Sequence, residues 1–218
     1  MKESEMKGKG RERLLEAAGE VFGEVGYKAA TVREITGRAG MNVAAVNYYF
    51  RDKEELYSAV LLHAQRCASE SSWVASGGDS AEARLRDFIG GMLRHLLDPL
   101  RPAWHSRVMA REMAMPTRML GELIEEGFRP KAEMLAGILR ELTDGRLSDE
   151  DLDRAGASII AQCVFYRQNR PVVLHLYPEL LGDGDPIGRL AAHIADFSLG
   201  GLEKLKEASP EKFSHVLL

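Results

Sequence analysis

The stretch FGEVGYKAATVREITGRAGMNVAAVNYYFRDKEEL, from Phe22 to Leu56, decides the fold. Gly26 predicts the end of a first helix, because glycine accepts the positive φ that is common at helix C-termini. Thr31 and Glu34 have the spacing of a capping box, in which the threonine oxygen accepts from the Glu34 amide. A second helix is therefore predicted from 32 to about 39, and Gly40 supplies the sharp turn that ends it.

A third and a fourth helix are predicted after that turn. The third lies at about 43–49. Asp52 is placed to cap the fourth, which carries Glu54 and Glu55 in its positively polarised first turn. Three short helices thus lead into one longer helix.

The remaining chain also has helical periodicity. Toward the N-terminus, apolar residues at helical spacing predict a first helix from about residue 11, while Gly8 and Gly10 among the charges of residues 1–10 predict a flexible arm. Toward the C-terminus, a Gly-, Ser- and Ala-rich segment at 74–80 predicts a loop. Further helices are predicted at about 81–97, 103–114, 117–127, 130–142, 148–168 and 185–208. The chain is therefore predicted to be all-α, with only the short apolar run at 172–176 ambiguous.

Composition permits several functions. The chain has 218 residues, 45% of them hydrophobic, and a formal net charge of -4, yet its first 66 residues carry 11 Lys and Arg against 10 Asp and Glu. A net acidic protein can bind DNA when its cations gather on one face, because screening makes phosphate attraction local. The charge permits nucleic-acid binding without predicting it.

Motifs for other classes of function are missing from the sequence. It has no GxSxG, GxxxxGK[ST] or HExxH, and its histidines have no HxH or HxxxH spacing. Cys67 and Cys163 have no CxxC pairing, so neither a disulfide nor a zinc site is expected. We therefore expect no enzyme activity, no cofactor and no metal. Without a signal-peptide pattern or a bilayer-length apolar run, a cytoplasmic protein with no membrane attachment is expected.

From Phe22 to Leu56 the sequence resembles the TetR family of transcriptional regulators. The resemblance rests on five features: the helix end at Gly26-Tyr27, the capped start of the next helix in TVREI at 31–35, the Ala39-Gly40 turn, the aromatic residues at 48–50, and the start of a further helix in KEEL at 53–56. The sequence departs from the family pattern at Thr36, Met41 and Asn42, where alanine, valine and serine are usual. The resemblance implies a three-helix helix-turn-helix DNA-binding domain at 11–66, followed by a helical effector-binding and dimerisation domain at 67–218.

By this resemblance the third helix would enter a DNA major groove. Its candidates for contacts to base edges are Val43, Ala44, Asn47 and Tyr48. Asn47 can pair with adenine through two hydrogen bonds, while Val43 and Ala44 can meet thymine methyl groups. The resemblance places four hydrogen-bond donors at phosphates: Thr31, Asn42, Tyr49 and Lys53. Ala45, Val46 and Phe50 are expected to pack inward, and for the tyrosines a plain aromatic cluster is the open alternative.

The resemblance also implies a homodimer and a small-molecule effector. The helices at 149–168 and 185–208 carry overlapping apolar stripes, and two such helices from each subunit could form a four-helix interface, although packing within one chain explains the same pattern. The segment 162–179 resembles the CerR-like or YbiH-like subgroup. The candidate effector pocket, with ordinary core as its alternative, contains Phe88, Met92, His95, Trp104, Arg107, Arg111, Phe128, Gln162 and Tyr166.

These observations predict a sequence-specific transcriptional regulator, most directly a repressor that a small molecule releases from a palindromic double-stranded DNA operator. Two other classes stay open. One is an activator or nucleoid-type DNA binder that needs no effector. The other is a helical interaction protein that has lost DNA binding, which would show no salt-dependent affinity for any duplex.

Overall fold

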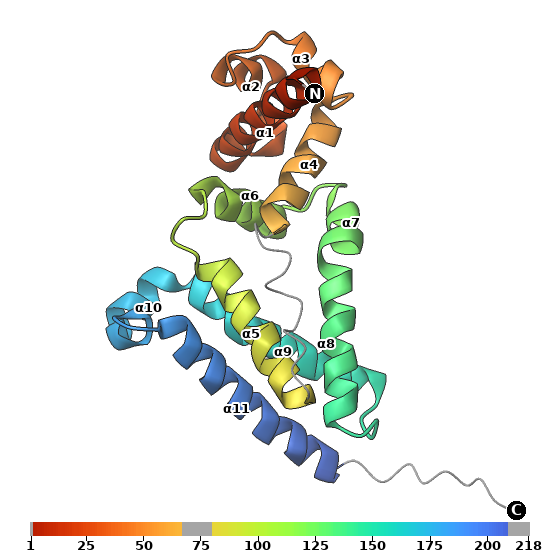
Figure 1. Cartoon of the computed structure of the whole chain (residues 1–218), viewed down its shortest axis with the longest axis vertical. Helices are drawn as coiled ribbons and strands as arrows, with labels where there is room; N and C mark the ends of the chain where they lie inside the picture. The colour runs from red at the N-terminus through yellow and green to blue at the C-terminus, as the bar shows by residue number, and fades with distance from the viewer. Residues whose placement is uncertain (1, 67–79, 209–218) are drawn as a thin grey trace, which may run out of the picture. The chain divides into compact units, whose positions relative to one another are not determined.

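The computed structural model describes residues 2–66 and 80–208, and within these ranges the chain is helical with no strand (Figure 1). The predicted all-α class is therefore confirmed. Cys67 and nearly all of the predicted loop at 74–80 lie outside the described residues. None of the described helices combines the length and the apolar character needed to cross a membrane.

The chain divides into two compact units, and the described residues of the first are 2–66 and 100–130. This unit contains α1 (Lys2–Ala29), α2 (Val32–Arg38), α3 (Ala44–Tyr49), α4 (Lys53–Gln65), α6 (Ala103–Ala114), α7 (Leu120–Leu123) and the π-helical turn η2 (Ile124–Phe128). The second unit contains α5 (Ala81–Leu97), most of α8 (Arg129–Leu142), α9 (Asp149–Gln168), α10 (Arg170–Leu176), the short 3-10 helix η3 (Pro178–Leu181) and α11 (Pro186–Ala208).

The local signals in the motif act as predicted. The Thr31 side chain accepts from the Glu34 amide at 3.1 Å, and Asp52 Oδ1 accepts from the amides of the first turn of α4. Gly26 has a φ of 82° and interrupts the helical backbone of α1, while Gly40 has a φ of 62° in the turn before α3. Caps and glycines therefore set the boundaries of these short helices.

The flexible arm predicted for residues 1–10 is wrong for residues 2–10, which form the first turns of α1. Gly10 faces the ring of Tyr49, and a methyl group at Gly10 would clash with the Tyr49 hydroxyl oxygen. The Lys7 ammonium also lies 5.2 Å from the centre of the Tyr48 ring. These contacts with α3 compensate for the low helix propensity of the glycines, and local sequence alone does not reveal them.

The compact units differ from the predicted division at residue 66, because residues 100–130 group with the helix-turn-helix residues in the first unit. Trp104 of α6 is 3% exposed and lies against Gly19 of α1. Its indole Nε1 donates to Glu16 Oε2 at 2.8 Å. Val108, Met119 and Leu123 join the same core, whose other buried members come from α1 to α4 and the segments between them. An apolar face on α6 and α7 thus completes the first unit.

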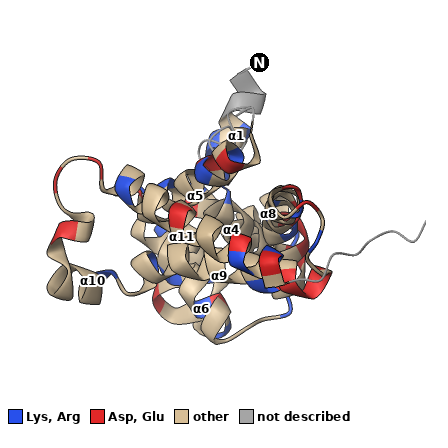
Figure 2. Cartoon of the chain, turned by 90° about the horizontal axis from the view of Figure 1, so that it is seen from below, with Lys and Arg blue, Asp and Glu red and all other residues tan. Residues whose placement is uncertain are grey.

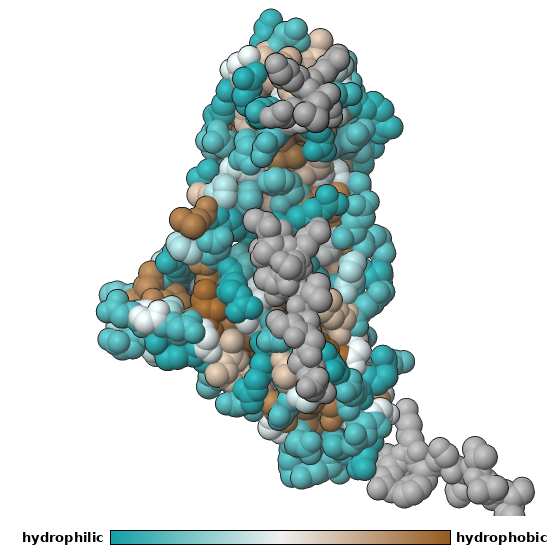
Figure 3. Space-filling model, viewed as in Figure 1, coloured by the Kyte–Doolittle hydropathy of each residue, from teal (hydrophilic) through white to brown (hydrophobic). Residues whose placement is uncertain are grey.

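In the second unit, α5 packs against α9 and α11 (Figure 1). The buried residues of this second unit include Leu85, Ile89, Ile159, Cys163 and Ile194. The predicted limits of α5 and α6 are confirmed at both ends, whereas the helix predicted at 117–127 is the short α7 followed by a π-helical turn. The ambiguous run at 172–176 belongs to α10 and exposes Val172, Leu174 and Leu176. Figure 3 shows where hydrophobic residues reach the surface on this face of the molecule.

Candidate nucleic-acid interface

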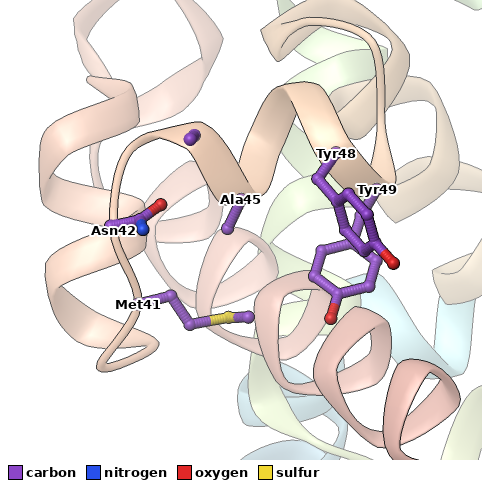
Figure 4. A pocket seen from close by; sticks show the side chains of 6 residues that line it. Met41, Asn42, Ala45, Tyr48 and Tyr49 are labelled. Atoms are coloured by element: carbon purple, nitrogen blue, oxygen red, sulfur yellow. The ribbon is translucent and has the colours of Figure 1, made fainter. Parts of the chain in front are cut away.

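Helix α3 exposes the four side chains predicted to read bases. Val43, at its N-terminus, is 52% exposed, Tyr48 is 64% exposed, and Ala44 and Asn47 are also exposed. Two of them, Ala44 and Tyr48, line an open hollow of about 390 Å³, whose other lining residues are Met41, Asn42, Ala45 and Tyr49 (Figure 4). An exposed helix face with an amide, small apolar groups and an aromatic ring can contact the edges of base pairs.

The opposite face of α3 is anchored in the core. Ala45, Val46 and Phe50 are buried, as predicted. Phe50 ends the helix, and its amide donates to the Val46 carbonyl at 2.7 Å. Because these residues fix the rotation of α3 about its own axis, Asn47 and Tyr48 point outward by necessity.

The first turns of α1 bring cationic side chains close to α3. Basic and acidic residues are interspersed along α1 (Figure 2). The Lys7 ammonium lies near the exposed Tyr48 ring, and the Arg11 guanidinium lies 4.6 Å from the centre of the Phe50 ring. Sequence reasoning placed Lys7 in a solvated arm and missed this position. The separation of four residues between Lys7 and Arg11, which puts both on one helix face, is the signal that could have found it.

The four predicted phosphate contacts differ in their surroundings. Thr31 and Asn42 are exposed, while Tyr49 is half-buried against Gly10. The Lys53 ammonium donates to the Ala30 carbonyl at 2.7 Å and lies 4.6 Å from the centre of the Tyr27 ring. Burial lowers the pKa of Lys53 from its ordinary value. Lys53 therefore already ties α4 to the end of α1, and its remaining hydrogens are those available to a phosphate.

The helix-turn-helix is held to α6 and α7 through α4. Tyr57 donates its hydroxyl to Glu112 Oε2 at 2.9 Å, and Glu112 is fully buried. Ser58 donates its hydroxyl to the Glu122 carboxylate of α7. Burial and the Glu112 carboxylate both raise the pKa of Tyr57, so its hydroxyl stays protonated and able to donate. Polar contacts thus fix α4 at the centre of the unit.

The nine predicted effector residues divide between the two units. Trp104, Arg107, Arg111 and Phe128 belong to the first unit. Trp104 and Arg107 face glycines of α1, and Arg111 Nε donates to the Gly23 carbonyl at 2.9 Å. These three residues therefore hold α6 against α1, and their place in an effector pocket stays a prediction. The sequence could not reveal this, because the partners lie more than eighty positions apart.

The other five candidates belong to the second unit. Phe88, Met92 and His95 are buried on α5, and Gln162 and Tyr166 are half-buried on α9. Helices α5 and α9 pack together. Burial raises the pKa of Tyr166, which keeps its hydroxyl neutral. This smaller set retains the mixture of apolar, aromatic and polar groups on which the pocket prediction rests.

Two family models match the sequence, one for each end of the chain. The family described as bacterial regulatory proteins, tetR family, matches residues 14–60. The C-terminal domain of the HTH-type transcriptional dual regulator CecR matches residues 81–202. The second match contains the segment 162–179, whose resemblance to a TetR subgroup was noted above.

Individual proteins that are similar to this chain are also transcriptional regulators. The HTH-type transcriptional repressor AcnR of Corynebacterium efficiens is 30% identical over 200 residues, which cover 91% of each chain. CecR of Shigella flexneri is 40% identical over 84 residues, but these span only 38% of this chain and 28% of CecR. A bacterial regulatory protein in the tetR family from Rhodococcus RHA1 has a similar fold, with a TM-score of 0.63 at 22% identity, covering 89% of this chain and 97% of that one.

Proposed function

Because this chain belongs to the TetR family of DNA-binding transcriptional regulators, which are not enzymes, we propose that it is a homodimeric repressor that a small-molecule effector releases from a palindromic operator. The exposed face of α3, with buried residues on its opposite face, is the observation that carries the proposal. The names of AcnR and of the NicS protein of Pseudomonas putida describe repressors, which favours repression over activation.

Base reading is assigned to the exposed face of α3. Asn47 is placed to donate to and accept from adenine, and Val43 and Ala44 to contact thymine methyl groups. Each good two-bond amide–base pair discriminates against other bases by about 1–3 kcal/mol. Asn47 is therefore the residue expected to contribute most to sequence preference.

Phosphate contacts are assigned to the residues around α3. Thr31, Asn42, Tyr49 and Lys53 offer donors there, and Lys7 adds a cation beside Tyr48. Such contacts hold the protein in register on the duplex and carry no sequence information. Their loss would weaken binding to all sequences alike.

Dimerisation is assigned to the exposed faces of α9 and α11. Phe165 on α9 is 45% exposed, while Phe197 and Leu205 on α11 are 68% and 42% exposed. Gly201 has the same helical phase as Phe197 and Leu205, and a side chain added to it would meet nothing within 4 Å. Large apolar groups beside small residues favour close packing of helices between two copies. A dimer of this kind would present two α3 helices to successive major grooves, about 34 Å apart.

Effector binding is assigned to the side chains of α5 and α9 where these helices pack together. Met92 can adapt to an apolar ligand, and His95, Gln162 or Tyr166 can fix a polar end. An effector bound there would alter operator affinity by about 5- to 150-fold, the usual range of such coupling. An activator or nucleoid-type binder would instead keep its affinity whatever small molecule is added.

Selection from a random pool of duplexes by the purified full chain tests the proposal. We expect enrichment of one palindrome, bound by two chains with an affinity that falls steeply with salt. Failure to enrich any sequence would remove the proposed operator and favour a helical interaction protein. A selected operator then allows metabolites to be screened for release.

A further inference from the structure

Three side chains with metal-ligating atoms meet inside the first unit, and each comes from a different helix. Glu16 lies on α1, His63 on α4 and His105 on α6, and one ligand atom of each lies within 4.8 Å of the other two. His63 Nε2 is 3.7 Å from Glu16 Oε1. The two imidazole rings lie edge to face, with their centres 5.4 Å apart. The sequence does not predict this cluster, because 47 positions separate Glu16 from His63 and 42 positions separate His63 from His105.

His105 supplies an independent sign of a missing ligand. Its side chain is buried, with the residue only 8% exposed, and its Nε2 has no hydrogen-bond partner among the described residues. Its other ring nitrogen, Nδ1, accepts from Arg101 Nε at 3.0 Å. Native proteins rarely leave a buried polar atom unsatisfied, and a bound ion can supply the partner that such an atom lacks.

Neighbouring groups orient the other two side chains. The Trp104 indole donates to Glu16 Oε2 at 2.8 Å, so the second carboxylate oxygen, Oε1, remains directed at His63. The His63 ring stacks on the Trp104 ring, with centres 6.0 Å apart and planes inclined by 17°. Outer partners that fix the direction of a carboxylate and an imidazole are a regular feature of metal sites.

We propose that Glu16, His63 and His105 bind one divalent transition-metal ion, with Zn²⁺ the ion that fits best. Two imidazoles and one carboxylate suit zinc, whereas Ca²⁺ and Mg²⁺ prefer all-oxygen sets. Three protein ligands leave a fourth position for water. The His63 side chain is 42% exposed, which gives the ion a route from solvent.

Metal binding requires a small closure of the three side chains. Zinc ligands lie about 2.0–2.2 Å from the ion, which places tetrahedral ligand atoms about 3.4 Å apart. The separation of 3.7 Å between Glu16 and His63 is therefore already close to that distance, and the other separations, all within 4.8 Å, have to shorten by at most about 1.4 Å. Since the ligands come from α1, α4 and α6, the bound ion would clamp the fourth helix of the helix-turn-helix motif to its two neighbours.

Arg101 competes with the ion for His105. While Arg101 donates to Nδ1, the single proton of the neutral ring sits on Nε2. An ion at Nε2 needs that proton to move to Nδ1, which breaks the bond from Arg101 and releases no net proton. Arg101 also donates to the Ala64 carbonyl at the end of α4, and this second hydrogen bond holds its guanidinium beside His105. Removing the Arg101 guanidinium should therefore strengthen metal binding.

Titration of the tag-free, metal-stripped full chain with Co²⁺ tests the proposal, since tetrahedral cobalt absorbs visible light and Zn²⁺ should displace it. We expect one ion per chain, at least about a tenfold loss of affinity in His63→Gln and Glu16→Gln, and tighter binding in Arg101→Ala. His175→Gln, which changes an exposed histidine of α10, is the matched control.

Circular dichroism of each variant separates loss of a ligand from loss of the fold. Failure of Co²⁺ to bind the folded wild-type chain, or equal affinity in His63→Gln and wild type, would overturn the proposal. The titration uses no DNA, so its outcome is independent of the proposed operator binding.

Discussion

Tyr57 of α4 donates its hydroxyl to the fully buried carboxylate of Glu112 on α6 at 2.9 Å. The same carboxylate accepts from the amide and the hydroxyl of Thr117, at 2.8 and 2.9 Å. A carboxylate without exposure to water depends on such donors, because desolvation otherwise penalises its charge. This network joins the helix-turn-helix to residues 100–130.

Tyr57→Phe should therefore destabilise the protein by about 1–3 kcal/mol, since it removes one donor from a buried carboxylate and adds none. Urea unfolding of the full chain measures the change. Tyr48→Phe is the matched control, because the Tyr48 side chain is exposed, and it should change stability by less than about 0.5 kcal/mol. Equal stability of the two variants would show that the network contributes nothing.

Two glycines in the first turns of α1 should respond differently to alanine. A methyl group at Gly8 meets nothing within 4 Å, so Gly8→Ala should raise stability by about 0.5–1 kcal/mol through helix propensity. A methyl group at Gly10 would displace the Tyr49 ring, so Gly10→Ala should weaken binding to every duplex while leaving sequence preference intact. Thermal unfolding and duplex titration of both variants check this. Identical behaviour of the pair would contradict the packing of Tyr49 on Gly10.

Phe197→Glu should convert the dimer to a monomer, because it places a charge on the exposed apolar face of α11. Sedimentation over a range of protein concentrations measures the association. Met115→Glu is the control, since Met115 is 71% exposed and belongs to the first unit. A Phe197→Glu chain that remains dimeric would move the interface to another face.

Cys163 should be unreactive in the folded chain. It is fully buried, and burial raises the pKa of its thiol to about 12. The thiolate is the reactive form, so at pH 8 a thiol reagent should modify the folded Cys67→Ser chain far more slowly than the same chain in urea. Equal rates in both conditions would place Cys163 at the surface.

Features of the fold that depend on residues close together in the sequence could be predicted, and features that depend on residues far apart in the sequence could not. The Thr31 and Asp52 caps and the positive φ of Gly40 are local, and each was predicted correctly together with the buried side of α3. The helical start of α1 was not predicted, and there Gly10 lies against Tyr49, 39 positions away in the sequence.

Whether a candidate site could be predicted also depends on how far apart its residues lie in the sequence. The outward face of α3 follows from helical period and could be read from the sequence. The bonds from Trp104 to Glu16 and from Arg111 to Gly23 join residues 88 positions apart, so the sequence does not reveal that these side chains hold α6 against α1. The meeting of Glu16, His63 and His105 has the same origin, and no spacing rule predicts it.

Titration of Asn47→Ala against the selected operator and its single-base-pair variants tests the central claim most directly. Asn47 lies on the exposed face of α3. We expect the wild-type chain to discriminate by about 1–3 kcal/mol at one base pair of each half-site, and Asn47→Ala to lose this discrimination while keeping the others. A uniform loss of affinity for all duplexes, with discrimination unchanged, would contradict base reading by α3.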